Sequence, residues 1–537
     1  MSRKTAMILI LALMPAAAMF AADGDDNGLS SYFETYFADK VKTFELENGM
    51  TFLLVNRPEV PVFSAVVSVK AGSVDEPRGK TGVAHVFEHM AFKGTTSIGS
   101  TDYTAEKEIL ARIEDIGLRL TKARQRESSA PDQIKQLEND LKTVQDEHEK
   151  YIKDNEFSQI YNHHGANFVN AGTAADLTLY MVNLPSNQLE LWARMETDRL
   201  LQPVFRQFYK ERDVIMEERR MGVDNDPMGH LREEFTAAAF AAHPYGDPVI
   251  GYMSDIAGLT IADARAFHKK YYVPNNIVVS VVGDVTVGKL KPVAEKYFGL
   301  LPRKPDPERN IPEEPLQQAE RRVYIHRDAE PQLLMGWHIP RYPTAGAAAM
   351  RILADVLGSG RTSRLYKRLV LEENIATRVS VFDMSISRYP QLLSISVAPR
   401  DETEYDRIIE IIDEEIQSLI DHPPTQAEID KVKKSFVADF IRGLESNFVF
   451  ALQLSYFHHM LGSSQMLGQF VADIQKLEPA DISQVTGKYL GSLNRTIGFL
   501  VPKESHETDE ISEEEKIMRE KMHRMKENHS HGMGGSQ

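Results

Sequence analysis

The chain has 537 residues, of which 42% are apolar and 26% are charged. This balance is typical of a soluble globular protein, and the length exceeds what one hydrophobic core supports, so two large domains are expected. The formal net charge of −16 argues against nucleic acid as a partner, because phosphate binding needs a basic face. The chain contains no cysteine, which excludes disulfides, thiol nucleophiles and cysteine-based metal sites.

The first 22 residues have the order of a secretory signal peptide. Two basic residues precede an apolar run from Ala6 to Leu13, and a stretch of small residues ends before Asp23. The A-x-A pattern favours cleavage after Ala18, whereas the switch to acidic composition favours cleavage after Ala22. The apolar run is too short to span a bilayer, so we expect no stable membrane anchor, although a retained anchor is the alternative. An exported, periplasmic protein is expected if the source is a Gram-negative bacterium.

The first half of the chain begins with strands and continues with helices. Asn48-Gly49 lies between the first two strands and predicts a hairpin turn. Alternating apolar residues predict strands, and apolar residues at helical spacing predict helices. The expected strands are 43–47, 51–56, 62–70, 166–173, 177–184 and 275–284, and the expected helices include 187–200 and 206–223.

Residues 101–154 differ from their surroundings in composition. They are rich in Lys, Glu, Gln, Asp and Leu at helical spacing, interrupted at Ser128 to Asp132. This pattern predicts two antiparallel helices, a helical hairpin inserted into the first domain. A solvated charged arm is the plain interpretation of its charges, and a surface for a partner is the other.

The second half repeats the order of the first weakly, which suggests an internal duplication. Strands are expected near 322–325, 332–338, 377–384 and 391–397, with a helix near 345–356 and long helices after them. We therefore expect an α+β fold with two homologous domains, each an antiparallel-rich sheet packed by helices. The expected divisions are a first domain at 40–300, a linker at 301–318, a second domain at 319–503 and a charged, His-containing tail at 504–537.

A short motif carries the chemistry of the first domain. His85-Val-Phe-Glu88-His89 places two imidazoles one helical turn apart, where they can bind one metal ion. Glu88 lies beside them and suits the role of general base for a metal-activated water. As a bare pattern this motif also arises by chance, and a helix with two satisfied histidines is the alternative.

A third protein ligand is needed, with water in the fourth position. The acidic run from Glu211 to Glu218 offers one, because these two residues are seven positions apart and lie on the same helical face. Glu217 points elsewhere, by about 100°. Taken alone, such an acidic run is also typical of a solvated helix face.

Four segments together resemble the M16 metallopeptidases, the family of pitrilysin, insulin-degrading enzyme and mitochondrial processing peptidase. The resemblance covers essentially the whole mature chain and is greatest to short bacterial members with two homologous domains. The segments, in chain order, are TGVAHVFEHMAFKGT, GANFVNAGTAADLTLY, FYKERDVIMEERRM and AHPYGDPVIG.

The resemblance implies a role for each matching residue. His85, His89 and Glu218 match the ligands of one Zn²⁺ per chain. Glu88 matches the general base, and Glu211 matches a second acidic residue that orients the site without coordinating. The family's substrate adds as a strand to an edge strand, and the matching residues here are Asn167, Asn170, Ala171 and Thr173.

One departure from the family bears on mechanism. Active members supply an Arg and a Tyr from a later domain to stabilise the oxyanion, and the matching positions here are Val370 and Thr377. Nearby Arg368 and Arg378 are interpreted as surface charges. The second half also lacks the metal motif. The chain is therefore expected to be the metal-bearing subunit of a heterodimer whose related partner supplies the Arg/Tyr pair.

Two functions remain in view from the sequence. The first is a zinc endopeptidase that hydrolyses extended peptides or unfolded polypeptides. The second is a noncatalytic binding or assembly subunit that retains the fold. Zinc is inferred from the ligand types, and the same ligands could bind manganese or cobalt.

Overall fold

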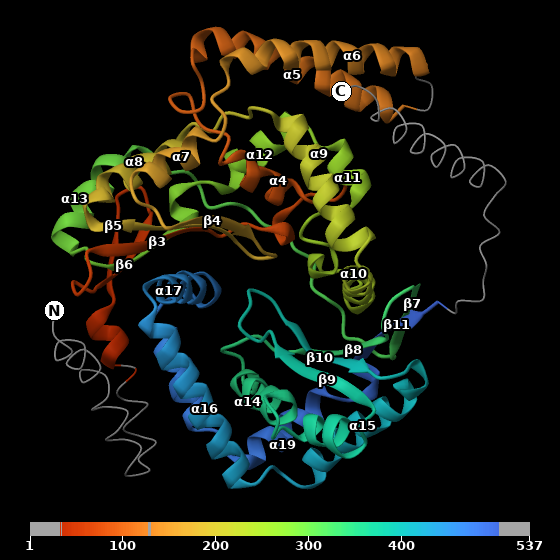
Figure 1. The fold of residues 1–537 in the computed structure, drawn as a ribbon. Helices are drawn as coiled ribbons and strands as arrows, with labels where there is room; N and C mark the ends of the chain where they lie inside the picture. The colour runs from red at the N-terminus through yellow and green to blue at the C-terminus, as the bar shows by residue number, and fades with distance from the viewer. Residues whose placement is uncertain (1–32, 34, 127–129, 504–537) are drawn as a thin grey trace, which may run out of the picture.

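The computed structural model describes residue 33 and residues 35–126 and 130–503 (Figure 1). The expected signal peptide and the charged tail from residue 504 lie outside these residues. Within the described part, no helix combines the length and apolar composition needed to cross a bilayer.

The first half is built on a six-stranded sheet with the order β1-β2-β6-β3-β5-β4. Neighbouring strands are antiparallel, except that β2 and β6 are parallel. The predicted turn at Asn48-Gly49 joins β1 and β2, and Gly49 has a φ of 90° there. The strands are β1 (Lys42–Glu45), β2 (Thr51–Asn56), β3 (Val62–Val69), β4 (Phe168–Thr173), β5 (Thr178–Pro185) and β6 (Ile277–Gly283).

Helices cover one face of this sheet (Figure 1). Helix α4, which carries the metal motif, packs between β4, α9 and α12. The helices of the first half, apart from the hairpin described next, are α4 (Val83–Met90), α7 (Glu156–His163), α8 (Leu189–Leu201), α9 (Phe208–Arg219), α10 (Pro227–Ala239), α11 (Met253–Gly258), α12 (Ile261–Tyr271) and α13 (Val287–Tyr297). A π-helical turn, η4 (Arg220–Asp224), extends α9. Helices α7, α10, α11, α12 and α13 were not predicted from the sequence.

The predicted helical hairpin is present as α5 (Tyr103–Arg124) and α6 (Pro131–His148). The Asp102 side chain accepts from two N–H groups at the start of α5, and Pro131 opens α6, where its missing N–H is not needed. The two helices lie above α9 and α12 in Figure 1. Close packing fixes them there, because a Cβ on Gly117 would overlap the ring of Tyr209 on α9.

The second half is built on a five-stranded sheet with the order β7-β11-β8-β10-β9, in which only β7 and β11 are parallel. Its strands are β7 (Arg321–Arg327), β8 (Gln332–Ile339), β9 (Ala376–Asp383), β10 (Gln391–Pro399) and β11 (Arg495–Pro502). Its helices are α14 (Ala347–Gly358), α15 (Tyr405–Asp421), α16 (Gln426–Glu445), α17 (Asn447–Leu461), α18 (Met466–Gln475) and α19 (Pro479–Tyr489), with a π-helical segment η8 (Tyr366–Glu372). Residues 301–320 form no helix or strand.

The two sheets share one topology. When β2, β6, β3, β5 and β4 are matched to β7, β11, β8, β10 and β9, the order and every relative direction agree. Helices α4 and α14 follow the matching strands β3 and β8, and each begins after a glycine in the left-handed region, Gly82 with φ 88° and Gly346 with φ 86°. The duplicated α+β fold expected from the sequence is thus confirmed.

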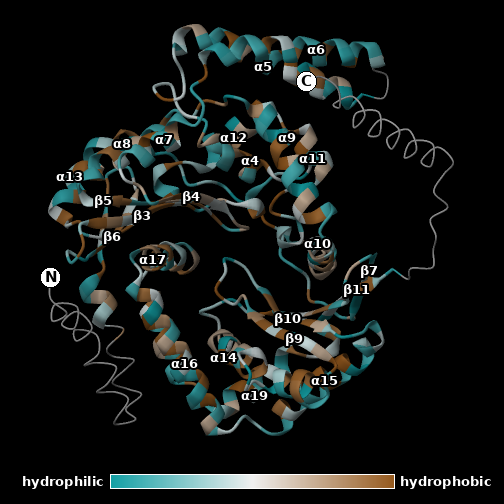
Figure 2. Ribbon diagram, viewed as in Figure 1, coloured by the Kyte–Doolittle hydropathy of each residue, from teal (hydrophilic) through white to brown (hydrophobic). Residues whose placement is uncertain are grey.

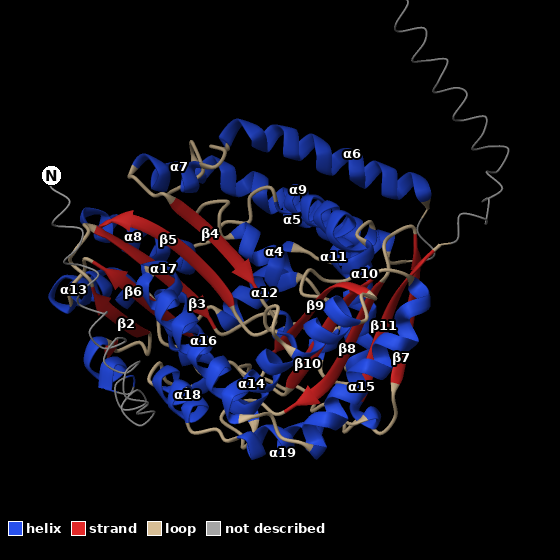
Figure 3. Cartoon of the chain, turned by 60° about the horizontal axis from the view of Figure 1, so that its bottom comes forward, coloured by secondary structure: helices blue, strands red, loops and turns tan. Residues whose placement is uncertain are grey.

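The two halves exchange one helix each. Helix α10 of the first half packs on β7, β8 and β11, whereas α17 of the second half packs on β3 and β6. Leu231 and Phe235 of α10 are buried with Leu334 and Leu500 of the second sheet. The face of each sheet that its own helices leave open is therefore covered by a helix from the other half (Figure 3).

Apolar residues follow this arrangement. Figure 2 shows hydrophobic residues concentrated on strands β3, β5 and β9, and hydrophilic residues on much of the outer surface of α6. One core lies between the first sheet and its helices, and a second joins the second half to the inner face of the first sheet. Phe33 and Phe37, ahead of β1, belong to the second core and contact Phe440. These two phenylalanines, although they precede the first domain, thus pack on the second half.

Candidate metal centre and active site

The start of α4 is fixed by a carboxylate. Glu76 accepts hydrogen bonds from the N–H groups of Gly82 at 2.8 Å and Ala84 at 2.7 Å, which satisfies donors that a first helical turn leaves unpaired. A Cβ on Gly82 would lie 2.5 Å from the carbonyl oxygen of Ile250, so the close approach and the positive φ both require glycine. Burial raises the pKa of the Glu76 carboxyl well above its usual value.

His85 and His89 lie side by side on α4. Their ring centroids are 4.9 Å apart, as the i, i+4 spacing predicts. The Nε2 atom of each ring lies 3.9 Å from Oε2 of Glu218 on α9. The structure therefore brings together the three side chains that the sequence singled out as metal ligands, although they come from helices more than 120 positions apart.

The donor set of these three residues fits a zinc ion. One ligand atom from each lies within 4.8 Å of the other two, and this is the one such group of His, Cys, Asp or Glu among the residues that the structure describes. A tetrahedral zinc with bonds of about 2.0–2.1 Å holds its ligand atoms about 3.4 Å apart. The 3.9 Å separations are therefore close to those that zinc requires.

Charges around the two imidazoles differ. Burial, together with His89, lowers the pKa of His85 to about 4, so that its ring is neutral and its nitrogen free to act as a ligand at neutral pH. Burial alone would also lower the pKa of His89, but its hydrogen bond to Glu211 and the nearby carboxylates raise it. His89 Nδ1 lies 3.4 Å from Glu211 Oε2. Glu211 thus contacts the side of the ring that faces away from Glu218.

Glu88 lies between the histidines and strand β4. Its side chain is only 9% exposed, and the Thr173 hydroxyl donates a hydrogen bond to its Oε2 at 2.8 Å. Burial raises the pKa of Glu88, while the Thr173 hydroxyl and backbone N–H oppose that rise. A carboxylate with a raised pKa is a better proton acceptor near neutral pH.

Strand β4 forms one edge of the first sheet, next to α4 (Figure 3). The Ala174 N–H donates to the Leu177 carbonyl at 2.8 Å. This bond shows which residues of β4 direct their peptide groups at β5 and which direct them away from it. Because antiparallel pairs alternate, the peptide groups of Val169, Ala171 and Thr173 face the open edge, and no described strand pairs with them. A peptide could add there as a further strand.

The four residues proposed to bind substrate occupy different places on this edge. Asn167 precedes β4 and is exposed, and Asn170 is exposed on the opposite face of the strand from Ala171. Ala171 is partly buried against the first core, on the same face as Thr173. Only Thr173 contacts Glu88.

Among its described residues, the second half has no matching metal site. With the two glycines that start α4 and α14 aligned, Ala349, Ile352 and Leu353 stand where the first half has His85, Glu88 and His89, and all three are at most 1% exposed. The ligand positions have become part of the core. The sequence predicted a helix near 345–356, and α14 lies there.

Val370 and Thr377, where an Arg and a Tyr were sought, lie on η8 and β9. Val370 packs against the core of the second half, and the Thr377 hydroxyl donates to the Ala398 carbonyl at 3.2 Å. Arg368 donates to Glu414 at 2.7 Å and to Glu415 at 3.0 Å. Its guanidinium is therefore held by carboxylates of α15.

Two residues at the site were not singled out from the sequence. Glu76 caps α4, but its place six residues ahead of Gly82 gives no recognisable signal. Lys93 donates to Glu211 Oε1 at 2.5 Å, but it lies three residues past the end of α4, where helical spacing gives no signal.

Models of one peptidase family match most of the chain. The model described as insulinase (peptidase family M16) matches residues 51–146 and 144–252. The model described as the peptidase M16 inactive domain matches residues 258–436. The first match contains the whole candidate site, and the second contains α14 and the apolar positions described above.

Relatives and solved structures agree with these models. Zinc protease PqqE of Helicobacter pylori is 29% identical over 492 residues, covering 88% of this chain and 96% of that one. A Mycobacterium leprae protein named as an uncharacterized zinc protease is 25% identical over 467 residues, covering 85% and 90%. A protease structure from Helicobacter pylori has a TM-score of 0.71 at 26% identity, covering 86% of this chain and 99% of that one. The first half of the periplasmic protease PqqL from Escherichia coli shares the fold, with a TM-score of 0.63 at 18% identity, covering 86% and 92%.

The topology, the site residues and the relatives thus indicate the same family, and the chain belongs to the M16 family of peptidases.

Proposed function

We propose that this chain is a zinc-dependent endopeptidase that hydrolyses peptide bonds in extended peptides or unfolded polypeptides. The observation that carries this proposal is the placement of Glu88 between a His85, His89 and Glu218 group and the open edge of β4. When bound, zinc supplies Lewis acidity and lowers the pKa of a coordinated water. One ion per chain is expected.

Glu88 is proposed as the general base. Its carboxylate accepts the proton of the attacking water and then delivers it to the leaving amine. Glu211 holds His89 Nδ1, which would keep the Nε2 lone pair directed at the metal position that His89 shares with His85 and Glu218. The substrate lies along β4, where the open peptide groups of Val169 and Ala171 bind its backbone and give little sequence selectivity.

We also propose that a related subunit completes the site. Neither Val370 nor Thr377 can supply the charged and phenolic donors that would stabilise an oxyanion. The same absence favours the second candidate function, a noncatalytic M16-fold subunit for binding or assembly. Retention of Glu88 beside both histidines favours catalysis, because binding alone does not require that base.

Metal content tests the proposal directly. Purified chain is expected to contain about one zinc ion per molecule by atomic emission, and a chelator should remove the ion together with any peptide hydrolysis, which added zinc should restore. Full hydrolytic activity of the lone chain would contradict the proposed second subunit. A chain that binds no zinc would contradict the endopeptidase.

The Thr173 hydroxyl should affect the pKa of Glu88, the proposed general base. It stabilises the ionised form of Glu88 and so lowers its pKa, and Thr173→Val should therefore raise that pKa. Because the base must be ionised, the acid limb of the kcat/KM profile should move to higher pH, with little change above it. Thr173→Ser keeps the hydroxyl and should leave the limb near its wild-type position. An identical acid limb for Thr173→Val would show that Glu88 is not the titrating base.

Export to the periplasm is proposed as well. The order of residues 1–22 supports it, and the related fold from Escherichia coli is described as a periplasmic protease. Fractionation of cells that express the tagged chain, with N-terminal sequencing of the mature form, would distinguish cleavage after Ala18 from cleavage after Ala22.

A further inference from the structure

Glu211 and Lys93 form an ion pair beside Nδ1 of His89, on the opposite side of the ring from the metal-binding Nε2. Glu211 is 12% exposed and uses both carboxylate oxygens: Oε2 faces His89 Nδ1 at 3.4 Å, and Oε1 accepts from Lys93 Nζ at 2.5 Å. Burial would raise the pKa of Glu211, but its bonds to His89 and Lys93 lower it. Among the described residues, Lys93 is the only Lys or Arg paired with this carboxylate.

The segment that carries Lys93 is held in place by a buried arginine, Arg206. Arg206 is 1% exposed, and its guanidinium donates to the carbonyls of Lys93 at 3.2 Å, Ile98 at 2.9 Å and Thr95 at 2.8 Å. It also binds both carboxylate oxygens of Glu106 on α5. Residues 93–98 are therefore fixed from within the protein.

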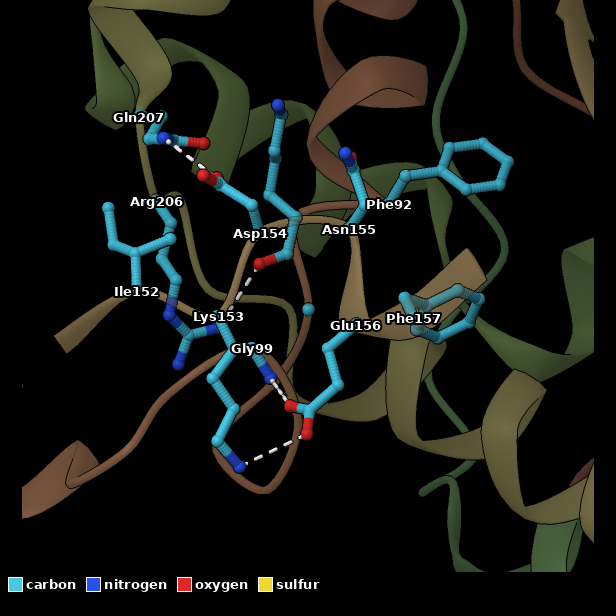
Figure 4. Close-up of a pocket in the computed structure, with 12 residues that line it drawn as sticks. Phe92, Gly99, Ile152, Lys153, Asp154, Asn155, Glu156, Phe157, Arg206 and Gln207 are labelled. Atoms are coloured by element: carbon cyan, nitrogen blue, oxygen red, sulfur yellow. Dashed lines mark hydrogen bonds and ion pairs between the residues drawn. The ribbon is translucent and has the colours of Figure 1, made fainter. Parts of the chain in front are cut away.

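Figure 4 shows the pocket where Arg206 meets the segment that follows α6. Arg206 lies beside Ile152, and Asn155, Glu156 and Phe157 lie on the opposite side. Glu156 accepts from the Gly99 N–H at 2.5 Å and from Lys153 Nζ at 3.1 Å, and Gln207 donates to Asp154 at 3.3 Å. The two ends of the inserted hairpin thus join the loop that leads back to Lys93.

We propose that Lys93 is a positioning residue for the metal centre, acting through Glu211 on His89. Its ammonium holds the Glu211 carboxylate in place, directed at His89 Nδ1. Such outer contacts fix the orientation of a histidine ligand, and their loss typically lowers metal affinity about 10- to 100-fold. This inference rests on the proposed zinc site.

Without Lys93, Glu211 would keep its burial but lose its compensating cation. A carboxylate in that position turns toward water. The Nδ1 contact of His89 then weakens, and its Nε2 atom is less well held for metal binding. The effect should appear in zinc affinity before any substrate is present.

The test measures zinc binding to metal-free protein by competition with a chromophoric chelator. Lys93→Met should raise the zinc dissociation constant about 10- to 100-fold, and Lys93→Arg should restore most of the affinity. Lys153→Met is the matched control, because Lys153 lies at the same junction but pairs with Glu156, and it should bind zinc as the wild type does. Lys93→Gln serves if Lys93→Met does not fold.

A double-mutant cycle separates positioning from general damage. If Lys93 acts through Glu211, then Lys93→Met should have little further effect on zinc affinity in a Glu211→Gln background. Equal effects in both backgrounds, or an unchanged dissociation constant in folded Lys93→Met protein, would overturn the positioning role alone. Wild-type protein that binds no zinc would overturn the proposed function itself, and this inference with it.

Discussion

Glu88→Gln should lower kcat for peptide hydrolysis by about 10²- to 10⁴-fold, the usual contribution of a positioned acid–base group, while zinc content stays at about one ion per chain. The amide keeps the size of the side chain and can still contact the Thr173 hydroxyl, which lies 2.8 Å from the Glu88 carboxylate. It cannot accept a proton from water. The loss should therefore appear in kcat, with the zinc dissociation constant and the melting temperature nearly unchanged.

Glu217→Gln is the matched control for this substitution. Glu217 neighbours the metal ligand Glu218 in sequence, but its side chain is 60% exposed and pairs with Arg220. The change should leave kcat as in the wild type. Both variants should be assayed with whichever subunit assembly proves active. If Glu88→Gln hydrolyses peptide at the wild-type rate, the chain is not using this site as a peptidase, and the noncatalytic function becomes the better explanation.

Much of the fold followed from local patterns. Strand β2 begins and ends where alternation placed it, and the Asn48-Gly49 turn joins β1 to β2 as its residue types require. The hairpin 101–154 was predicted from charged residues at helical spacing, and α6 begins at Pro131, inside the interruption predicted at Ser128 to Asp132. In each case the signal lies within about ten residues of the feature it predicts.

Long-range features had no such signal. Strand β11 was not predicted, although it lies between β7 and β8 and completes the second sheet. The exchange of α10 and α17 between the halves was also not foreseen, because an apolar helix face indicates burial without naming the surface that covers it. The expected division at residues 301–318 separates two stretches of chain, but α10 lies before it and packs on the second sheet.

The candidate site shows the same contrast. The spacing of His85, Glu88 and His89 was enough to suggest a metal, because all three lie on one short helix. Glu218 was chosen over Glu211 only through the family resemblance, since both lie on the same face of α9. Their separate places, beside His85 and His89 for one and behind His89 for the other, depend on how α9 crosses α4.

Arg206→Met should lower the free energy of unfolding by about 3–5 kcal/mol, the usual cost of breaking a buried ion pair from one side. Arg206 is 1% exposed and Glu106 is 0% exposed, so removal of the guanidinium leaves a buried carboxylate that keeps its contact with His148 but loses its arginine. Three loop carbonyls also lose their donor. Urea denaturation of the metal-free protein, followed by circular dichroism, measures the loss.

The control for this prediction lies in the same hairpin. Arg112 on α5 pairs with Glu147 on α6 at 2.9 Å, but the two side chains are 54% and 41% exposed, and an exposed pair contributes at most about 1 kcal/mol. Arg112→Met should therefore shift the denaturation midpoint only slightly. Because Arg206 also holds the carbonyl of Lys93, its loss should weaken zinc binding, whereas the loss of Arg112 should not. Equal stability and equal zinc affinity for the two variants would mean that the hairpin is fastened to the metal centre by something other than this arginine.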